Sequence, residues 1–272
     1  MLAAALLVSV ALSAQGQTAK VQFECVAPNL IQQRLEMVSR KPSERKSTLE
    51  SLFDQAGCGE EYRSEQPVHG PKEPNIICTL QSDASGPGTI VVGGHWDFVN
   101  DGTGAVDDWS GAALLPSLYQ SLRAVPRRHR FIFVAFAAEE TGLTGSSKFV
   151  GKLSAEERKN IRAMINLECL GMEPPEVWAS RADKTLVNDY AVVARSLGLA
   201  VAGVNVDRVG DDDSHPFLAA GIPVLTMHSV TSANLHILHS PADNLKAINH
   251  EHYYAAYRFA AVYLAYLDNA LD

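Results

Sequence analysis

Short, continuous apolar runs alternate with segments of helical periodicity along most of this chain. Apolar runs bounded by turn residues are typical of strands that are buried on both faces of a sheet. The runs that predict strands are residues 75–80, 89–94, 131–138, 161–167, 176–179, 201–207 and 222–228. Periodicity, proline starts and glycine stops predict helices at residues 28–39, 42–56, 110–122, 146–153, 184–197, 215–220 and 250–271.

This alternation predicts one α/β domain, an α/β/α sandwich whose mixed, mostly parallel β-sheet is flanked by helices. The chain has 272 residues, of which 46% are hydrophobic, and it can therefore bury a large core. We expect residues 75–272 to form the core of the domain. Residues 17–74, which contain two predicted helices, are expected to form a helical cap of the same domain.

The stretch FIFVAFAAEE, residues 131–140, carries the first chemical clue. Glu139 and Glu140 come where its strand is expected to stop, and α/β sheets bind ligands at such strand ends. Two adjacent carboxylates repel each other, so one of them tends to stay protonated unless a positive charge keeps both ionised. A metal ion would supply that charge, although a Glu-Glu pair on its own is more typical of a solvated helix start.

Similar side chains occur at other strand ends and in loops. His95 and Asp97 follow one predicted strand, Glu168 follows another, and loops supply Asp107 and His239. Because such residues are rarely buried unless they are paired or bind a metal, one shared site would explain all of them. Histidine and carboxylate ligands without thiolates suit zinc, and more than four candidate ligands suggest two ions bridged by one carboxylate.

These residues lie in five ordered motifs: GGHWD (93–97), DDWSG (107–111), AFAAEE (135–140), NLECLG (166–171) and HSPAD (239–243). With these motifs in this order, the chain resembles the zinc exopeptidases of the M28 aminopeptidase family. The resemblance runs from about Asn75 to the C-terminus, so residues 1–74 add nothing to it beyond a plausible helical cap.

Motif by motif, the resemblance implies which residue does what. The zinc ligands would be His95 and Glu168 for one ion, Glu140 and His239 for the other, and Asp107 as the bridge between them. Glu139 would be the general base, which takes a proton from water and passes it to the leaving amine. Asp97 would accept the other ring N–H of His95 and fix its tautomer, and Asp108 would cap the following helix.

Three departures from the family pattern bear on the chemistry. Leu238 stands where family members often carry a tyrosine that can stabilise the oxyanion. The usual Ser-Asp-His before Pro-Phe appears here as DDSHPF, residues 212–217. Glu168 stands where aminopeptidases of this type more often have aspartate, and glutamate there is associated with carboxypeptidase action. The polarity of attack therefore stays open.

The leading hypothesis is a hydrolase, a metallo-aminopeptidase with two zinc ions that removes N-terminal residues from peptides. A carboxypeptidase of the same fold is a variant of this hypothesis. The second hypothesis is a glutaminyl-cyclase-like acyltransferase with one zinc, against which the intact His95, Asp107 and Glu168 speak. A non-catalytic binding domain ranks last, because every ligand position is filled. The sequence leaves the side-chain preference and the oligomeric state open.

Residues 1–16, MLAAALLVSVALSAQG, form a short apolar run followed by small residues. This pattern is typical of a secretory signal peptide, and it is too short to span a membrane. No basic residue precedes Lys20, so the basic start of such a signal is missing, and an N-terminal helix packed on the body is the alternative. We expect a secreted or periplasmic protein.

The four cysteines fit no C-x-x-C metal or redox spacing. In an exported protein, Cys25 and Cys58 are the expected disulfide pair, because they flank the predicted cap helices. Cys78 and Cys169 are expected to be buried thiols. The formal net charge of −8 argues against nucleic acid as a partner. The expected partner is a peptide substrate, with no membrane contact.

Overall fold

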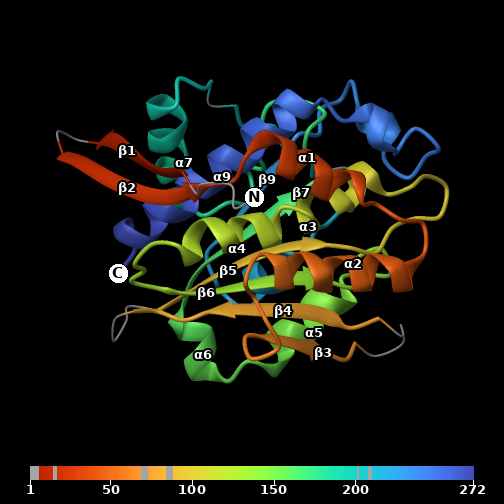
Figure 1. Ribbon diagram of the computed structural model, residues 1–272, viewed down its shortest axis with the longest axis horizontal. Coiled ribbons are helices and arrows are strands. Elements are labelled where there is room, and N and C mark those ends of the chain that lie inside the picture. Colours follow the sequence, from red (N-terminus) through yellow and green to blue (C-terminus); the bar gives the residue numbers. More distant parts are fainter. Residues whose placement is uncertain (1–5, 15–16, 69–72, 84–87, 201, 208–209) are drawn as a thin grey trace.

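A seven-stranded sheet crosses the centre of the molecule (Figure 1). The computed structural model describes residues 6–14, 17–68, 73–83, 88–200, 202–207 and 210–272. The strands of the sheet are β3 (Arg63–Gln66), β4 (Asn75–Leu80), β5 (Thr89–His95), β6 (Arg130–Phe136), β7 (Ile161–Glu168), β8 (Glu176–Val177) and β9 (Val224–His228). Their order is β3-β4-β6-β5-β7-β9-β8. The central strands β6, β5, β7 and β9 are parallel and the outer ones antiparallel, which confirms the predicted mixed, mostly parallel sheet.

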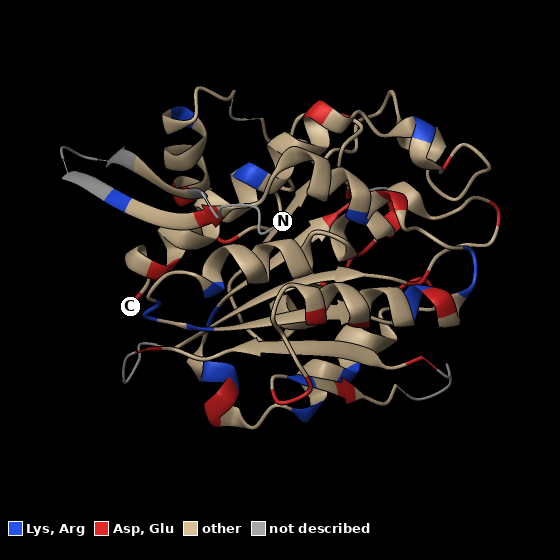
Figure 2. Ribbon diagram, viewed as in Figure 1, with Lys and Arg blue, Asp and Glu red and all other residues tan. Residues whose placement is uncertain are grey.

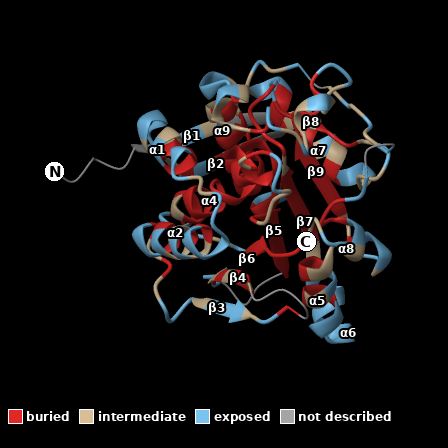
Figure 3. Ribbon diagram, turned by 90° about the vertical axis from the view of Figure 1, so that its right-hand side faces the viewer, coloured by how far each residue is buried: buried red, intermediate tan, exposed pale blue. Residues whose placement is uncertain are grey.

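Helices cover both faces of this sheet (Figure 3). One layer contains α1 (Pro28–Glu36), α2 (Pro42–Gln55), α3 (Ser110–Ala112), α4 (Leu115–Arg123), α7 (Lys184–Ser196) and α9 (His250–Ala270). The other contains α5 (Thr144–Lys152), α6 (Ala155–Asn160) and α8 (His215–Ala219). Irregular or 3₁₀ turns occur at Ala105–Trp109, Leu235–Ile237 and Leu245–Ala247. Among the described helices, none has both the length and the apolar character that a membrane span needs.

Two apolar cores lie on the two faces of the sheet, because alternate residues of each strand point to opposite sides. On one face, Phe133 of β6 packs against Tyr119 of α4, with ring centroids 5.7 Å apart. On the other face, Phe136 of the same strand lies 6.1 Å from both Phe149 of α5 and Phe217 of α8. The central strands are therefore buried on both sides, as their continuous apolar runs predicted.

The N-terminal part contains the two predicted cap helices but also strands that the sequence did not indicate. β1 (Leu6–Ala14) and β2 (Gln17–Cys25) form an antiparallel hairpin, so residues 6–14 are not the packed helix considered as an alternative. Val21 and Phe23 of β2 are buried in the core under α9 and α4. The export signal stays a prediction.

Three further elements differ from the sequence prediction. Residues 202–207 form no strand and contribute only one bridge, between Gly203 and Val177, beyond the short edge strand β8. The helix predicted at 110–122 is broken between α3 and α4, because Pro116 has no N–H to donate to the preceding turn. The short helix α6 was missed, although its capping box of Ser154 and Glu157 is visible in the sequence.

Cys58 and Cys78 form a disulfide, so the predicted Cys25–Cys58 pair and the free Cys78 thiol are wrong. The antiparallel pairing of β3 with β4 places Cys78 opposite Arg63, beside the loop that follows α2 and carries Cys58. Cys25 lies instead at the end of β2, where its Sγ is 3.4 Å from Tyr254 Oη. Cys169 is a buried free thiol, as predicted.

Candidate metal centre

The predicted ligands come together where the parallel strands end, in a region where acidic positions gather (Figure 2). His95 is the last residue of β5 and Glu168 is the last residue of the neighbouring strand β7. Glu139 and Glu140 follow β6 within a tight turn, Asp107 lies in the irregular turn Ala105–Trp109, and His239 lies in the loop after β9. Five separate segments of the chain thus contribute to one site.

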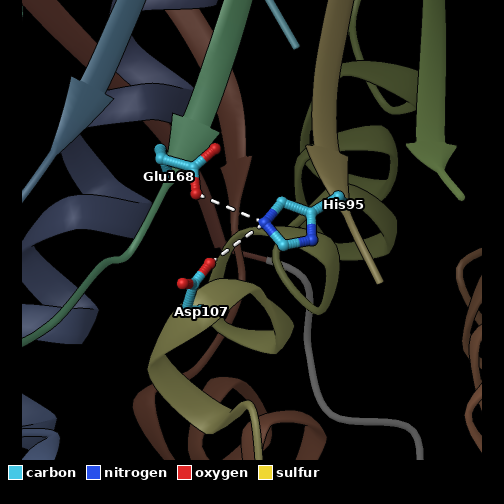
Figure 4. Close-up of side chains that lie close together, drawn as sticks. All are labelled: His95, Asp107 and Glu168. Atoms are coloured by element: carbon cyan, nitrogen blue, oxygen red, sulfur yellow. Dashed lines mark hydrogen bonds and ion pairs between the residues drawn. The ribbon is translucent and has the colours of Figure 1, made fainter. Parts of the chain in front are cut away.

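His95, Asp107 and Glu168 form the first group of donor atoms (Figure 4). His95 Nε2 lies 3.1 Å from Asp107 Oδ1 and 3.4 Å from Glu168 Oε1. The imidazole is almost fully buried, with 1% of its side chain exposed; Asp107 is buried as well, and Glu168 is partly accessible. The three side chains therefore converge on one point from three elements.

Asp107, Glu140 and His239 form a second group on the other side of Asp107. His239 Nε2 lies 3.1 Å from Asp107 Oδ2 and 3.0 Å from Glu140 Oε2. Each carboxylate oxygen of Asp107 thus faces a different imidazole. This is the arrangement expected of a carboxylate that bridges two metal ions.

The spacing of the donor atoms fits a divalent metal. Ligand atoms at ~2.0–2.1 Å from a tetrahedral zinc lie roughly 3.3 Å from one another. The distances within the two groups run from 3.0 to 3.4 Å. In addition, Glu140 Oε1 is buried without a hydrogen-bond partner among the described residues, which leaves an acceptor for an ion.

Asp97 lies beside His95 but makes its hydrogen bonds to the turn after β6. Its Oδ1 lies 3.5 Å from His95 Nδ1, on the side of the ring away from the ligand atom. Its two carboxylate oxygens also accept the backbone N–H groups of Glu139 and Glu140, both at 3.1 Å. Among the described residues His95 Nδ1 has no hydrogen-bond partner, so Asp97 faces the histidine ring without a hydrogen bond to it, and its two hydrogen bonds hold the turn that carries the glutamates.

Asp108 caps the helix that follows it, as predicted, and also ties two strand ends together. Its Oδ1 accepts N–H groups of Gly111 at 3.0 Å and Cys169 at 2.9 Å. Its Oδ2 accepts the N–H of His95 at 3.2 Å. Since Cys169 follows Glu168, this single carboxylate fixes the backbone at His95 and beside Glu168, two of the three predicted ligands of the first group.

Asn75 is a supporting residue that the sequence analysis missed. Its Oδ1 accepts the N–H of Ala137 at 2.9 Å, and its Nδ2 donates to Gly145 O at 2.9 Å. These bonds hold both ends of the turn that contains Glu139 and Glu140. The signal in the sequence was a polar residue at the start of an otherwise apolar run. In the structure Asn75 is fully buried.

Backbone strain gathers at the same place. Among the described residues, the non-glycine positions with positive φ are Ala138, Leu143, Cys169 and His239. Ala138 precedes Glu139, Cys169 follows Glu168, and His239 is itself a predicted ligand. A left-handed conformation costs an L-residue ~1–2 kcal/mol, and such strain clusters at functional sites, where it aims side chains.

The electrostatics of the site favour bound cations. Burial raises the pKa of Glu139 to about 10 and that of Glu140 to about 7, and neighbouring carboxylates, Asp107 among them, add to the shift. The hydrogen bond with Asp107 raises the pKa of His239 to about 9. Without metal, Glu139 and His239 hold their protons at neutral pH and Glu140 is partly protonated, and a bound cation would displace these protons.

The residues that depart from the family pattern lie around the centre. His215, from DDSHPF, does not join either donor group, and its Nδ1 lies 3.4 Å from Asp211 at the surface. Asp212 accepts the hydroxyl of Thr226 at 2.6 Å and so fastens this segment to β9. Leu238 lines a cavity beside His239.

The chain is similar to known aminopeptidases. Aminopeptidase YwaD of Bacillus subtilis (strain 168) is 30% identical over 168 residues, which cover 59% of this chain and 34% of that protein. The structure of an aminopeptidase from Aneurinibacillus sp. strain AM-1 matches with a TM-score of 0.63 and 28% identity, covering 71% of this chain and 48% of that one. This chain thus spans about a third to a half of the length of these relatives.

A glutaminyl cyclase from an Acidobacteriales bacterium has the same fold, with a TM-score of 0.73 at 20% identity, covering 89% of this chain and 93% of that one. The family model for peptidase family M28 matches residues 75–264, which is most of the chain and all of the predicted ligands. Members of this family are metallopeptidases, in agreement with the donor groups at the strand ends. The chain therefore belongs to peptidase family M28.

Proposed function

We propose that this protein is an aminopeptidase that holds two zinc ions and removes N-terminal residues from peptides. The observation that carries the proposal is Asp107, whose two oxygens each lie 3.1 Å from a different imidazole. A centre with one zinc would leave either His95 or His239 without a function. Bound ions would polarise the scissile carbonyl and lower the pKa of a water molecule at the site.

Glu139 is the general base in this proposal, and Glu140 is a ligand. Glu139 Oε2 lies 3.9 Å from His95 Nε2, which is farther than the 3.0 Å between Glu140 Oε2 and His239 Nε2. Glu139, His95 and Glu140 could also form a donor group of their own, but the longer distance favours a free carboxylate. That carboxylate can take a proton from water and pass it to the leaving amine.

A cavity of about 390 Å³ opens beside the donor groups and supports recognition of a free amine. Its lining contains the carboxylates of Asp107, Glu139, Glu140, Glu168, Asp211 and Asp212. Among the described residues, which leave out Arg208, no lysine or arginine lines it. Carboxylates attract the ammonium group of a peptide N-terminus, whereas a carboxypeptidase needs a cation to bind the terminal carboxylate.

Part of the lining of this cavity is apolar and suits an uncharged first residue. Trp178, Val206, Val230 and Leu238 line it. His228 also lines it but is neutral, because burial lowers its pKa, and both ring nitrogens are bonded to the backbone. We therefore expect leucine or phenylalanine to be preferred over aspartate or glutamate as the residue that is removed.

A second, open hollow of about 850 Å³ lies between α5 and α8 and would take the rest of the peptide. It meets the first cavity at Glu139 and Glu140, which line both. A smaller, less open pocket and a more open groove that share the two glutamates suit an exopeptidase. The single residue enters the pocket and the chain of variable length leaves along the groove.

The test is hydrolysis of a substrate panel by zinc-reconstituted protein, with the zinc content measured per chain. The panel contains leucyl and glutamyl nitroanilides, a leucine peptide with a free or acetylated N-terminus, and a peptide with N-terminal glutamine. We expect two zinc ions, hydrolysis only from the free N-terminus, and a higher kcat/KM for the leucyl compound. Cleavage of the acetylated peptide from its C-terminus would instead establish a carboxypeptidase.

Glutaminyl cyclisation is the second candidate, since this chain covers 93% of the solved cyclase but only 48% of the solved aminopeptidase. One zinc per chain, together with loss of ammonia from the glutamine peptide and no release of amino acids, would favour the cyclase. The intact pair of His95 and Glu168 ranks it below the aminopeptidase.

A further inference from the structure

Arg45 of α2 is a buried cation, and each of its hydrogen bonds within the described part of the chain goes to a backbone carbonyl oxygen. These carbonyl groups belong to the loops that carry His95 and Asp107 and to the segment just before α2. The Arg45 side chain is 0% exposed. Nε donates to Ser39 O at 2.7 Å and Nη1 donates to Trp96 O at 2.8 Å. Nη2 donates to the carbonyl oxygens of Thr103 and Gly104, the latter at 2.9 Å. One guanidinium thus joins three separate segments.

Two of these segments carry predicted ligands of the first donor group. Trp96 directly follows His95, and Gly104 precedes Asp107 by three residues. Arg45 therefore holds the backbone just after His95 and shortly before Asp107, and the side chains of these two residues lie 3.1 Å apart. Gly104 has a φ of 58°, and a Cβ there would lie 2.3 Å from Phe98 Cβ and 2.9 Å from Arg45 Nη2. The loop is thus built around the guanidinium.

The same loop also contacts the segment that carries His239. Asp243 accepts the N–H of Thr103 through its backbone oxygen and the N–H of Val106 through Oδ1, both at 2.7 Å. A Cβ at Gly102 would lie 2.5 Å from Ser240 O, which shows how closely the two loops approach. The loop between Arg45 and Asp243 is therefore held from both sides, and its position affects both donor groups.

Packing alone does not explain why a charged side chain, rather than an apolar one, lies at position 45. Within the described part of the chain, no carboxylate accepts a hydrogen bond from Arg45, and the rings of Phe98 and Trp109 cover it, with centroids 4.2 and 5.4 Å from the central carbon. A buried charge is costly, and an apolar side chain of similar volume would pack at lower cost. What arginine alone offers is a planar fork of five donors that can reach several carbonyl groups at once.

We propose that Arg45 is a positioning residue of the metal centre, which holds the loops of His95 and Asp107 at ligand spacing before an ion binds. Arg45 lies outside the residues matched by the family model, in the N-terminal cap, so the cap takes part in forming the site. This inference rests on the proposed metal centre. It does not depend on which peptide bond the protein cleaves.

The test compares Arg45→Lys and Arg45→Met with Arg34→Met. Arg34, in α1, is also buried, but it donates to Ser117 Oγ at 2.7 Å and Gln120 Oε1 at 2.8 Å, away from the ligand loops. The measurements on each full-length variant are zinc affinity against a chromogenic chelator, the visible spectrum of the cobalt-loaded protein, and the melting temperature.

We expect both Arg45 variants to bind zinc about tenfold to hundredfold more weakly and to show a changed cobalt spectrum. Lysine keeps the charge, but a single ammonium cannot span the three segments. Arg34→Met is expected to lower the melting temperature and to leave zinc affinity and the cobalt spectrum as in the wild type. A folded Arg45→Lys protein with wild-type zinc affinity and spectrum would overturn the proposal.

A second variant keeps the test decisive if the Arg45 variants do not fold. Gly104→Ala leaves Arg45 in place but forces the same loop away from it, so the same loss of zinc affinity and the same spectral change are expected. Unchanged values there would also overturn the proposal. If the wild type itself binds no zinc, the metal centre fails, which is a different result from unchanged affinity in the variants.

Discussion

Glu139 and Glu140 are adjacent in the chain but lie in different surroundings. Glu140 Oε2 lies 3.0 Å from His239 Nε2, whereas Glu139 Oε2 lies 3.9 Å from His95 Nε2. Burial raises the pKa of both, to about 10 for Glu139 and about 7 for Glu140. Two identical side chains can therefore have separate functions, one as the base and one as the ligand, because the turn directs them to different neighbours.

The first prediction concerns this division. Glu139→Gln should lower kcat by about 10²- to 10⁴-fold with little change in zinc content, because only proton transfer is removed. Glu140→Gln should instead reduce zinc affinity, because an amide is a weaker ligand than a carboxylate. The measurements are steady-state kinetics and zinc per chain after dialysis. Loss of zinc in Glu139→Gln but not in Glu140→Gln would mean that the two assignments are reversed.

Residue types at strand ends and in loops indicated which side chains would share one site, and the family resemblance assigned the candidate ligands among them. His95 and Glu168 each end a strand, and their chemistry is visible in the sequence. The supporting residues Asn75 and Arg45 were not predictable in this way, because they act through backbone groups of segments far away in the chain. A sequence does not show which backbone carbonyls will lie beside a buried side chain.

At the scale of elements, the close approach of α5 to the end of β6 holds the glutamate turn in place. Gly145, in the first turn of α5, allows this approach, since a Cβ there would lie 2.1 Å from Ala137 O and 2.5 Å from Asn75 Oδ1. The far end of the same helix is open, and a Cβ at Gly151 would have no neighbour within 4 Å among the described atoms.

We therefore predict opposite effects of the same substitution at two sites in α5. Gly145→Ala should lower the free energy of unfolding by about 1–3 kcal/mol and should also weaken zinc binding, because the turn must move. Gly151→Ala should be neutral or should stabilise by up to about 1 kcal/mol, because alanine favours a helix. Urea denaturation and a zinc titration measure both effects. Equal effects at the two positions would contradict the packing argument.

The disulfide connects the N-terminal cap to the sheet. It joins Cys58, after α2, to Cys78 of β4, over a sequence separation of 20 residues. Closing a loop of this length stabilises a fold by about 3 kcal/mol in the chain-entropy model. Replacing both cysteines by alanine should lower the free energy of unfolding by about this amount in urea denaturation, and Cys25→Ala is the control. An identical urea midpoint with and without a reductant, for the unmodified protein, would argue against the bond.

Elements with strong local signals were predicted well, and elements that depend on distant partners were not. The strand β4 has the bounds that its apolar run predicted, Asn75–Leu80, because such a run favours a buried strand without reference to a particular partner. The strand predicted at 201–207 does not form at residues 202–207, which lie beyond the edge of the sheet and make only one bridge, and residue 201 lies outside the described residues. The pairing of Cys58 with Cys78 likewise depends on the antiparallel pairing of β3 with β4, which no local pattern fixes.

For the whole molecule, the metal centre couples folding stability to pH. Glutamate in an unfolded chain has a pKa near ~4.3 and histidine one near ~6.5. In the folded, metal-free protein the pKa values rise to about 7 for Glu140, about 9 for His239 and about 10 for Glu139. The folded state therefore binds more protons than the unfolded state throughout this range, and its stability falls as the pH rises.

Bound zinc should reverse this trend. Ligands must lose their protons to bind a metal, so apparent zinc affinity increases as the pH rises, and each increase stabilises the folded state by mass action. We predict that the difference in melting temperature between zinc-loaded and chelator-treated protein is larger at pH 8.5 than at pH 5.5. Thermal denaturation with and without chelator measures it directly. A difference that is constant or shrinks with rising pH would mean that these side chains do not exchange protons for metal, and that the clustered carboxylates serve another purpose.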